Sequence, residues 1–510
     1  MTGLAHPFGV SDPGNAKTTN ASSLHAPSGQ LVAISLLIFA AIWLLHLAST
    51  SLSPPVDSIE QLTWVRSLQW GYYKHPPLPT WLLWLPVQLL GWSRGTASLI
   101  GAAVTLGAMA LFWRLLRDLR GHSHAALALL AALCITYYNG RLNYYNHNVV
   151  LMLAVVASAW CCWQAFDTKR LHWWLALGIA MGLGALAKYQ IAVTAVSVLC
   201  FWLSQRGWRE PVHVRGLLLA ALTALLIFTP HMLWLQANDF GPVRYAMTTS
   251  LGAHLGPLAR TFNAGKWVAD QTLNRGLPAI IFLGVCAYSV RRRWRLPATN
   301  AGSQSRSAKP GSRALILCWA VVPLTFMPAV AVLFGADLQL QWGTAFMPFV
   351  VPAAMELLPR ALWQRVRMVF AVKVFLLLQG ILLLLSYLTS PVGPQSLQDH
   401  HWRTFKSKAF ADAIARSARA ELGGPIRVVI GDAAIAGALA LQLPESPVVL
   451  IDGSFPNSPW VAGELVSRCG ALEVLRAALQ PADATPVGSA FPGMFWRCIR
   501  PTRSSEVCSG

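Results

Sequence analysis

The stretch "GYYKHPPLPTW", residues 71–81, lies between two apolar parts of the chain and combines basic side chains with a stiff backbone. It holds one lysine, one histidine, two tyrosines and three prolines. Proline fixes its own φ and restricts the residue before it, so we expect Lys74 and His75 on a rigid, extended arm. Groups held in this way can neutralise a phosphate at a lipid surface. Lysine also reaches lipid headgroups as an anchor, so the stretch predicts either a phosphate contact or an anchor.

The composition of the whole chain is that of a membrane protein. It has 510 residues, of which 55% are apolar and 12% are charged, and its mean hydropathy is +0.48. A soluble domain carries about twice that share of charged residues. The net charge of +20 sits mostly in short loops between apolar runs. A nucleic-acid-binding protein would gather such charge on one soluble face, so we expect no nucleic-acid partner.

Apolar runs long enough to cross a bilayer recur along the chain, since a spanning helix needs roughly 20 apolar residues. The run at 31–47 resembles the core of a signal peptide, but its length favours an uncleaved first span. Only Lys188 and Tyr189 separate the fifth run from the sixth, and an error there would reverse the side of every later loop. The sequence predicts eleven spans, at 31–50, 96–116, 123–138, 148–166, 171–187, 190–204, 216–235, 277–290, 314–334, 343–358 and 368–388.

The charges of the loops predict the orientation of these spans. With the N-terminus in the cytoplasm, five inside loops are basic, and the loop at 291–313 has seven Lys/Arg and no acid. This asymmetry follows the positive-inside rule. It predicts a multi-pass inner-membrane protein whose C-terminal part lies in the periplasm of a Gram-negative cell. The outside segments are 51–95, 139–147, 236–276, 335–342 and the residues after about 389.

The chain divides into three parts by composition. Residues 1–30 are polar and rich in Ser, Ala and Gly, which predicts a disordered cytoplasmic N-terminus. Residues 31–390 form the predicted transmembrane domain, with 51–95 as its first periplasmic loop. Residues 391–510 predict a small periplasmic α/β domain, because "RTFKSKAFADAIARSARAELGG" has a helical pattern and "IRVVIGD" and "VVLID" suit buried strands.

Neither the cysteines nor the histidines form a metal pattern. The nine cysteines include no CxxC pair, so we expect no zinc or redox motif. The histidine pairs at 122/124 and 400/401 have no third ligand nearby in the sequence. An oxidising compartment permits disulfides, and we expect Cys469 to pair with Cys498 and Cys508 to stay free.

The first outside loop carries two carboxylates. Its "SPPVDSIEQLTWVRSLQWG" predicts a helix at 57–70, closed by Gly71, whose apolar face rests on the membrane surface. Asp57 and Glu60 are three residues apart and share one face of that helix. Asp followed three residues later by Glu is also a capping box. Two interpretations are open: a helix cap, or a carboxylate that takes a proton from an incoming hydroxyl.

Two further segments bring polar groups to the outside. "GIAMGLGALAKY" (178–189) ends near Lys188, which could bind phosphate or anchor its span. Its Gly178 and Gly182 make a GxxxG pattern, which indicates close helix packing. "NGRLNYYNHN" (139–148) is rich in amides and contains Arg141, and such groups suit sugar hydroxyls as well as an ordinary turn.

An apolar first span, an outside loop with Asp and Glu, and "YYKHPPLPTW" together resemble the polyprenyl-phosphate-dependent glycosyltransferases of the GT-C type. This is the bacterial branch related to protein mannosyltransferases and to the lipid A aminoarabinose transferase. The layout is similar over roughly residues 30–390, and "GLGALAKY" looks like the family's Gly-rich span ending in Lys. Two positions differ: Lys74-His75 stands where aminoarabinose-type enzymes have Glu-Lys, and Asn148 stands where many members have Asp. The resemblance therefore carries over neither a metal site nor aminoarabinose specificity.

The resemblance implies a GT-C-like, polytopic α-helical enzyme that transfers a sugar from polyprenyl (undecaprenyl) phosphate to an envelope acceptor such as lipid A or lipopolysaccharide core. Transfer would occur on the periplasmic side, with inversion, and with Asp57 as the catalytic residue. No cofactor or metal is expected, because basic side chains can meet the leaving phosphate. The alternative is a transporter of lipid-linked sugars without catalysis, but no repeat relates the two halves of the membrane region. The predicted substrate-binding residues are Glu60, Tyr73, Lys74, His75, Lys188, Arg141 and Asn148.

Overall fold

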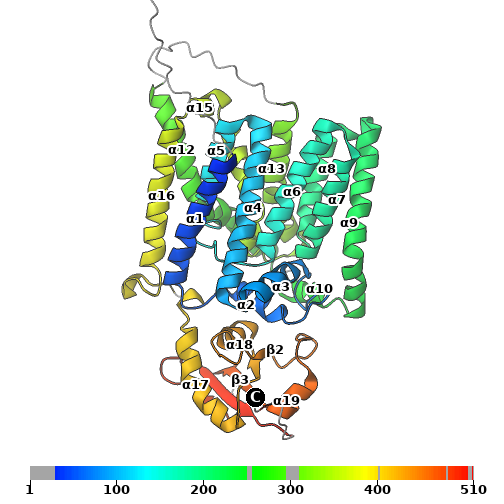
Figure 1. The fold of residues 1–510 in the computed structure, drawn as a ribbon. Coiled ribbons are helices and arrows are strands. Elements are labelled where there is room, and N and C mark those ends of the chain that lie inside the picture. The colour runs from blue at the N-terminus through cyan, green and yellow to red at the C-terminus, as the bar shows by residue number, and fades with distance from the viewer. Residues whose placement is uncertain are drawn as a thin grey trace, which may run out of the picture.

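The protein folds into a helical bundle with a small α/β domain beneath one end (Figure 1). The computed structural model describes residues 29–249, 255–293, 309–399, 402–477, 481–502 and 508. The predicted N-terminal tail, most of the loop at 291–313, and His400 and His401 lie outside these ranges.

Each of the eleven predicted spans contains a helix. Among the described residues, six helices are long and apolar enough to cross a membrane, or seven if a bent pair at 257–275 and 277–292 is one span. The number of membrane crossings therefore stays a prediction. The helices at the predicted spans are α1 (Gly29–Thr50), α4 (Arg94–Arg120), α5 (His122–Leu133), α6 (His147–Thr168), α7 (Leu171–Ala187), α8 (Ile191–Ser204), α9 (Pro211–Ala237), α12 (Leu277–Arg293), α13 (Ser312–Phe334), α14 (Met347–Met355) and α16 (Met368–Leu388).

Shorter helices join these or lie across the ends of the bundle. They are α2 (Val56–Trp64), α3 (Leu78–Leu90), α10 (Gly241–Thr249), α11 (Pro257–Ala269), α15 (Arg360–Gln364) and the short η1 (Gly207–Arg209), η2 (Asp270–Arg275), η3 (Leu340–Gly343), η4 (Gln395–Leu397) and η5 (Trp402–Thr404).

The predicted inside and outside loops gather at opposite ends of the bundle (Figure 1). At the inside end, Arg120 Nε donates to Glu356 Oε1 at 2.7 Å, which joins the end of α4 to the end of α14. At the outside end, the Leu52 N–H donates to the Arg403 carbonyl at 2.9 Å, which joins the first loop to the C-terminal part. This grouping agrees with the order of spans predicted from the charges. Which end faces the periplasm stays a prediction.

Close packing between α7 and α9 confirms the GxxxG interpretation. A Cβ at Gly178 would lie 2.6 Å from the Ala220 carbonyl oxygen, and one at Gly182 would lie 2.8 Å from Ile227 Cβ. No methyl group fits at either position without moving a helix. The glycines therefore bring two helices together, and they do not form a phosphate loop.

The small domain is built on one five-stranded sheet. Its strand order is β2-β1-β3-β5-β4, with β1 parallel to both β2 and β3 and the remaining pairs antiparallel. The two strands and the helix predicted from the sequence are confirmed as β1, β2 and α17. The elements are α17 (Ser407–Leu422), β1 (Val428–Gly431), α18 (Ala433–Ala440), β2 (Val448–Ile451), α19 (Gly463–Cys469), β3 (Ala471–Arg476), β4 (Thr485–Pro486) and β5 (Met494–Ile499).

The disulfide differs from the predicted one. Cys469 pairs with Cys508, with 5.4 Å between their Cα atoms, and Cys498 is free. Successive residues of a strand point to opposite faces of a sheet. Cys498 on β5 points to the α17 face, where its Sγ lies 3.7 Å from the Ala418 carbonyl oxygen. Ile499 points to the other face, where α19 packs, so Cys498 cannot reach Cys469.

The α2 part of the first outside loop packs into the core of the small domain. The α2 helix ends at Trp64 instead of residue 70, and Ile59, Leu62 and Trp64 are fully buried. Trp64 and Tyr72 share a hydrophobic cluster with α17, α18 and the sheet. The predicted surface helix is therefore wrong for α2. The next helix, α3, exposes Leu85 and Leu89 at the end of the bundle.

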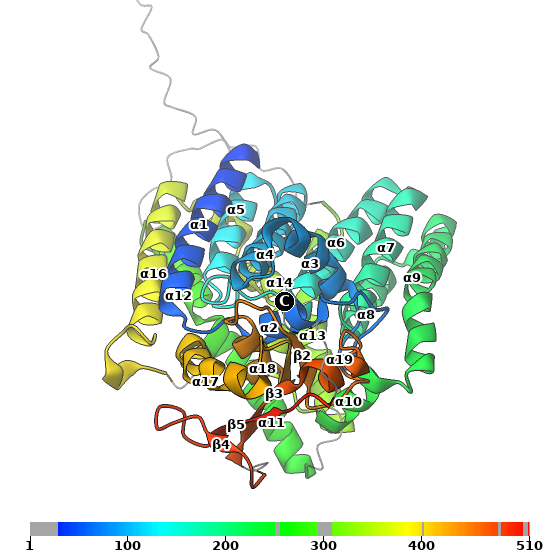
Figure 2. The ribbon, with the colours of Figure 1, turned by 60° about the horizontal axis from the view of Figure 1, so that its bottom comes forward.

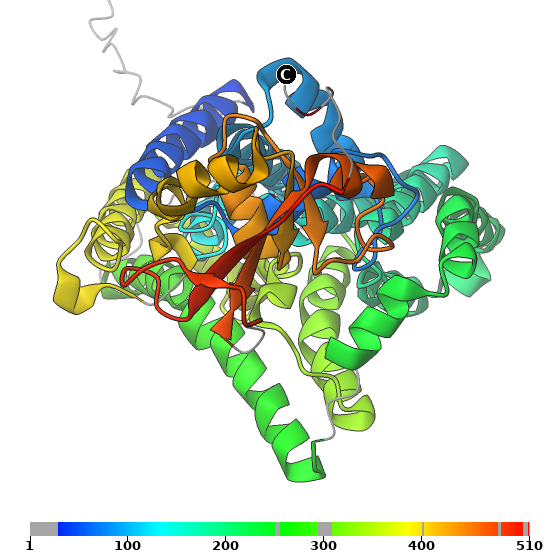
Figure 3. The same cartoon turned by 90° about the horizontal axis from the view of Figure 1, so that it is seen from below.

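The α18 helix packs directly on α2. Figures 2 and 3 show the small domain, in orange and red, covering the end of the bundle that carries α2. A Cβ at Gly437 would lie 2.3 Å from Ile59 Cγ2, so the two helices touch at a glycine. Arg66, just after α2, also donates to the Ser446 carbonyl at 3.1 Å. The helix that carries Asp57 and Glu60 is thus clamped between the bundle and the small domain.

Candidate active site

Asp57 lies in the first turn of α2 and is held by an amide from another loop. Its Oδ2 accepts a hydrogen bond from Asn146 Nδ2 at 2.8 Å. The N-cap of α2 is Pro55, and no side chain caps the helix, so the capping-box interpretation is wrong. Asn146 itself caps α6, because its Oδ1 accepts from the backbone N–H groups of Asn148 and Val149 at 3.0 Å each. One amide therefore starts α6 and orients the Asp57 carboxylate.

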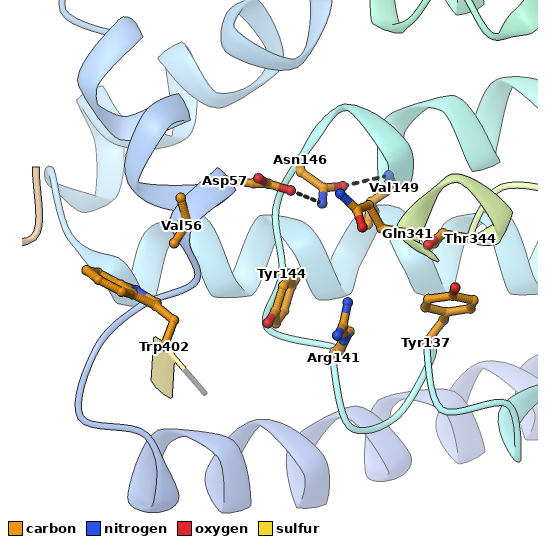
Figure 4. Close-up of a pocket in the computed structure, with 10 residues that line it drawn as sticks. All are labelled: Val56, Asp57, Tyr137, Arg141, Tyr144, Asn146, Val149, Gln341, Thr344 and Trp402. Atoms are coloured by element: carbon orange, nitrogen blue, oxygen red, sulfur yellow. Dashed lines mark hydrogen bonds between the residues drawn. The ribbon is translucent and has the colours of Figure 1, made fainter. Parts of the chain in front are cut away.

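Two cavities meet at Asp57. The larger has a volume of about 640 Å³ and the smaller about 230 Å³. Asp57 and Gln341 line both of them. Figure 4 shows Asp57 and its partner Asn146 at one side of the smaller cavity. A carboxylate in this place can contact one molecule in each cavity.

The larger cavity combines apolar and basic walls. Phe326, Met327 and Val330 of α13 form part of an apolar wall, and Lys74 and Lys188 lie with Asp57 at the polar end. Such a cavity can hold an apolar chain and an anionic group together. The structure thus brings together the lysines that the sequence placed on two separate outside segments.

Lys74 is paired with Glu60 on α2. Its Nζ lies 2.7 Å from Glu60 Oε1, and the two side chains are 20% and 5% exposed. Burial raises the pKa of the Glu60 carboxyl to about 7, although the charge of Lys74 opposes this shift. Burial alone would lower the pKa of Lys74, but the attraction of Glu60 outweighs it and the net shift is upward. Lys74 therefore stays protonated, and its charge is offset whenever Glu60 is ionised.

His75 lies in a tight loop and not on the extended arm predicted from the prolines. The Tyr72 N–H donates to the His75 carbonyl at 3.0 Å, which folds the loop back on itself. The His75 ring centroid lies 3.8 Å from that of His147. Burial, and then the charges of Lys188 and Lys74, hold the pKa of His75 well below its ordinary value. His75 is therefore neutral and offers hydrogen bonds, but no positive charge.

Lys188 is a buried cation without a paired carboxylate among the described residues. The side chain is 8% exposed, so the anchor interpretation is wrong. Its Nζ donates to Asn148 Oδ1 at 2.7 Å and lies 5.1 Å from the centre of the Trp342 ring. Burial lowers the pKa of Lys188 to about 7, against a weaker opposing effect of Asp57. An anion in the larger cavity would stabilise the protonated form.

The smaller cavity is polar and aromatic. Arg141 points into it between Tyr137 and Tyr144 (Figure 4). Trp402 lies at the end of the cavity opposite Tyr137, and its Nε1 donates to the Pro54 carbonyl at 2.8 Å. The segment that leads into the small domain thus forms one wall of the site.

The predicted site residues fall into three groups. Asp57, Lys74, His75 and Lys188 line the larger cavity, and Asp57 and Arg141 line the smaller one. Glu60 and Asn148 hold the two lysines through hydrogen bonds. Tyr73 lines neither cavity, because its ring packs edge-on against Trp64 and Tyr245.

Several lining residues are absent from the sequence prediction. Asn146, His147 and Tyr144 belong to the polar turn that supplied Arg141, and the turn "LQLQWG" (338–343) places Gln339, Gln341 and Trp342 together. Two glutamines and a tryptophan in one short outside turn are a pattern from which a sugar-binding segment could have been predicted. Tyr245 and Trp402 had no such local signal.

Comparisons with known proteins show what this chain is similar to. Residues 74–234 match the dolichyl-phosphate-mannose-protein mannosyltransferase family. The lipopolysaccharide core galacturonosyltransferase RgtA of Rhizobium johnstonii is 26% identical over 451 residues, which cover 83% of each chain. The undecaprenyl phosphate-alpha-4-amino-4-deoxy-L-arabinose arabinosyl transferase of Erwinia tasmaniensis is 25% identical over 263 residues, which cover 50% of this chain and 45% of that one.

A solved structure has the same fold. ArnT from Cupriavidus metallidurans, bound to undecaprenyl phosphate, superposes with a TM-score of 0.61 at 14% identity. The match covers 94% of this chain and 98% of that one, so it includes the small domain as well as the bundle. The resemblance inferred from the first outside loop is confirmed: the chain has the GT-C fold of ArnT, and its named relatives are glycosyltransferases.

Proposed function

We propose that the protein transfers a sugar from a polyprenyl (undecaprenyl) phosphate donor to an envelope acceptor such as lipid A or lipopolysaccharide core, with inversion at the anomeric carbon. The observation that carries the proposal is the position of Asp57, where the two cavities meet. Relatives whose names specify lipopolysaccharide core and undecaprenyl-phosphate-linked donors support both substrate classes.

The larger cavity is the proposed donor site. Its apolar wall suits a polyprenyl chain, and its lysines suit the phosphate that joins the chain to the sugar. Lys188 has no carboxylate partner to displace, so it is the better placed of the two lysines to take that charge. His75 can add a neutral hydrogen bond. The smaller cavity, on the other side of Asp57, is then the proposed acceptor site.

The proposed reaction needs one proton acceptor and one stabilised leaving group. Asp57 accepts the proton of the acceptor hydroxyl, and the hydroxyl oxygen forms a bond to the anomeric carbon. The bond from that carbon to the phosphate oxygen breaks, and the phosphate leaves with the electron pair. Lys188 and Lys74 stabilise the departing charge in a partly buried site, where electrostatic attraction is stronger than in water. Attack opposite the leaving phosphate inverts the anomeric configuration.

The alternative function is a transporter that moves lipid-linked sugars without catalysis. Mass spectrometry of envelope lipids from cells with and without the protein tests transfer, because cells without a transferase should lack one defined sugar on one acceptor. Asp57→Asn then separates transfer from transport. It keeps the size of the side chain, so we expect folded protein with turnover lowered by a factor of roughly 100 or more.

The control for this experiment is expression and thermal stability of the variant in the same membranes. Normal sugar modification by well-folded Asp57→Asn would contradict catalysis by Asp57 and leave transport as the better explanation. An unchanged glycan profile in cells lacking the protein would contradict transfer altogether.

The proposed location of this chemistry is the periplasmic face of the inner membrane. The basic loops at the opposite end of the bundle support that orientation. An alkaline phosphatase fusion at the C-terminus should be active, and one at about residue 300 should be inactive. The reverse pattern would contradict the orientation.

A further inference from the structure

Two arginines lie beside the smaller cavity without an acidic partner. Arg141 points into the cavity, and no carboxylate among the described residues lies within ion-pair distance of it. Its guanidinium carbon lies 5.3 Å from the centre of the Tyr144 ring. Asp57 faces the same space, but its carboxylate is bound to Asn146. The positive charge of Arg141 is therefore available to a ligand.

Arg275 lies behind one wall of the same cavity. Its guanidinium carbon lies 5.4 Å from the centre of the Tyr137 ring, and that ring lines the cavity. Its Nη1 donates a long hydrogen bond of 3.5 Å to Thr136 Oγ1, its side chain also interacts with that of Tyr137, and its buried Nε has no partner among the described residues. Burial, and then the charge of Arg141, lower the pKa of Arg275, so the two cations repel each other.

Two partly buried cations that repel each other are unfavourable in the empty site. An anion between or beside them would relieve the repulsion and satisfy unpaired N–H groups. The phosphate of the donor is not that anion, because the lysines for it lie in the larger cavity, beyond Asp57. The anion must come from another part of a substrate.

We propose that Arg141, supported by Arg275, forms a subsite for a carboxylate or phosphate group carried by a substrate sugar. This inference rests on the proposed function. The group has two possible sources: an acidic donor sugar such as a uronic acid, or an acidic substituent of the acceptor glycan. In both cases the fork of guanidinium N–H groups matches the planar or tetrahedral oxygens of the anion.

Binding measurements with matched lipids test this subsite in the intact protein in nanodiscs. The donor pair is undecaprenyl phosphate galacturonic acid against undecaprenyl phosphate galactose. The acceptor pair is lipid A with its phosphates and acidic inner-core sugars against lipid A stripped of both. We expect the wild type to bind the acidic member of one pair about 10- to 100-fold more tightly than the neutral member, and the pair concerned identifies the source.

Variants assign the preference to the arginines. Arg141→Gln should abolish the preference for the acidic lipid, Arg275→Gln should weaken it, and Arg141→Lys should keep part of it. Arg94→Gln is the matched control, because Arg94 is an exposed arginine that contacts only the Ser51 carbonyl. Equal binding within both pairs, or a preference that survives Arg141→Gln, would overturn the subsite. Because these are binding measurements, they remain valid if no sugar is transferred, and failure of transfer alone would count against the proposed function.

Discussion

Replacing Gly437 by alanine should lower sugar transfer more than it lowers stability. Gly437 lies on α18, outside both cavities, and faces Ile59 of α2. The new Cβ would lie 2.3 Å from Ile59 Cγ2, whereas an ordinary contact is 3.4–4 Å. A β-branched side chain in a helix has one strongly preferred χ1, so this methyl group cannot rotate away. We therefore expect α2 and α18 to move apart by about 1 Å.

The movement affects stability and chemistry differently. Overpacking of this kind costs about 1–3 kcal/mol of stability. Asp57 is two residues before Ile59 on the same short helix, so it moves with the displaced backbone. A misplacement of about 1 Å at a reacting group can lower the rate by roughly 100-fold. Turnover per folded molecule should thus fall by up to about two orders of magnitude.

The assay is sugar product formed per folded molecule in membranes, with the thermal unfolding temperature measured on the same preparation. Gly463→Ala is the control, since its Cβ would have no atom within 4 Å. The double variant Gly437→Ala/Ile59→Ala should recover turnover, because Ile59 Cβ, the next atom of that side chain, lies 3.8 Å away. Wild-type turnover per folded molecule in Gly437→Ala would refute the idea that α18 positions Asp57.

Three further predictions concern charge and covalent structure. Because burial lowers the pKa of Lys188 to about 7, the affinity for undecaprenyl phosphate should fall about tenfold per pH unit from pH 7.5 to 9. The variant Lys188→Arg stays protonated and should not show this fall in affinity. An equal fall in the wild type and in Lys188→Arg would contradict the role of Lys188. Burial raises the pKa of Glu60 from 4.5 to about 7, so the folded protein binds more protons than the unfolded chain in that window and loses stability as the pH rises through it. The unfolding temperature of Glu60→Gln minus that of the wild type should therefore increase from pH 5 to pH 7. A difference between the two unfolding temperatures that does not change with pH would contradict the raised pKa of Glu60. Peptide mapping without reductant should find a linked pair that contains Cys469 and Cys508 and an alkylated Cys498; a Cys469–Cys498 peptide would contradict the structure.

The bundle could be predicted well because its signals are local. A span is read from about 20 consecutive apolar residues, and loop charges lie beside the spans that they orient. Even the weak separation at Lys188 corresponds to a true break between α7 and α8. The short strands and the helix of the small domain were found for the same reason.

The details of the site could not be predicted because they depend on distant partners. Whether Asp57 caps α2 depends on Asn146, which lies 89 residues further along the chain. Whether the charge of Lys74 is offset depends on the ionisation of Glu60, and the burial that shifts the pKa of that carboxyl is not visible in the sequence. The disulfide depends on which face of the sheet Cys498 occupies. Alternation along β5 places the side chains of Cys498 and Ile499 on opposite sides of the sheet. Only the packing of the helices shows that Ile499, and not Cys498, lies on the side of α19.

The clamp on α2 also has a consequence for the order in which the protein is made. The hydrogen bond from Arg66 to Ser446 spans 380 residues, so α2 is synthesised long before the domain that covers it. At about 5–20 residues per second, the ribosome needs roughly 20–80 s to cover that distance. During this time the apolar side chains of Ile59 and Trp64 lack their final partners. A nascent or truncated chain therefore has the bundle without a fixed α2 helix, and we expect transfer to begin only after the small domain has folded.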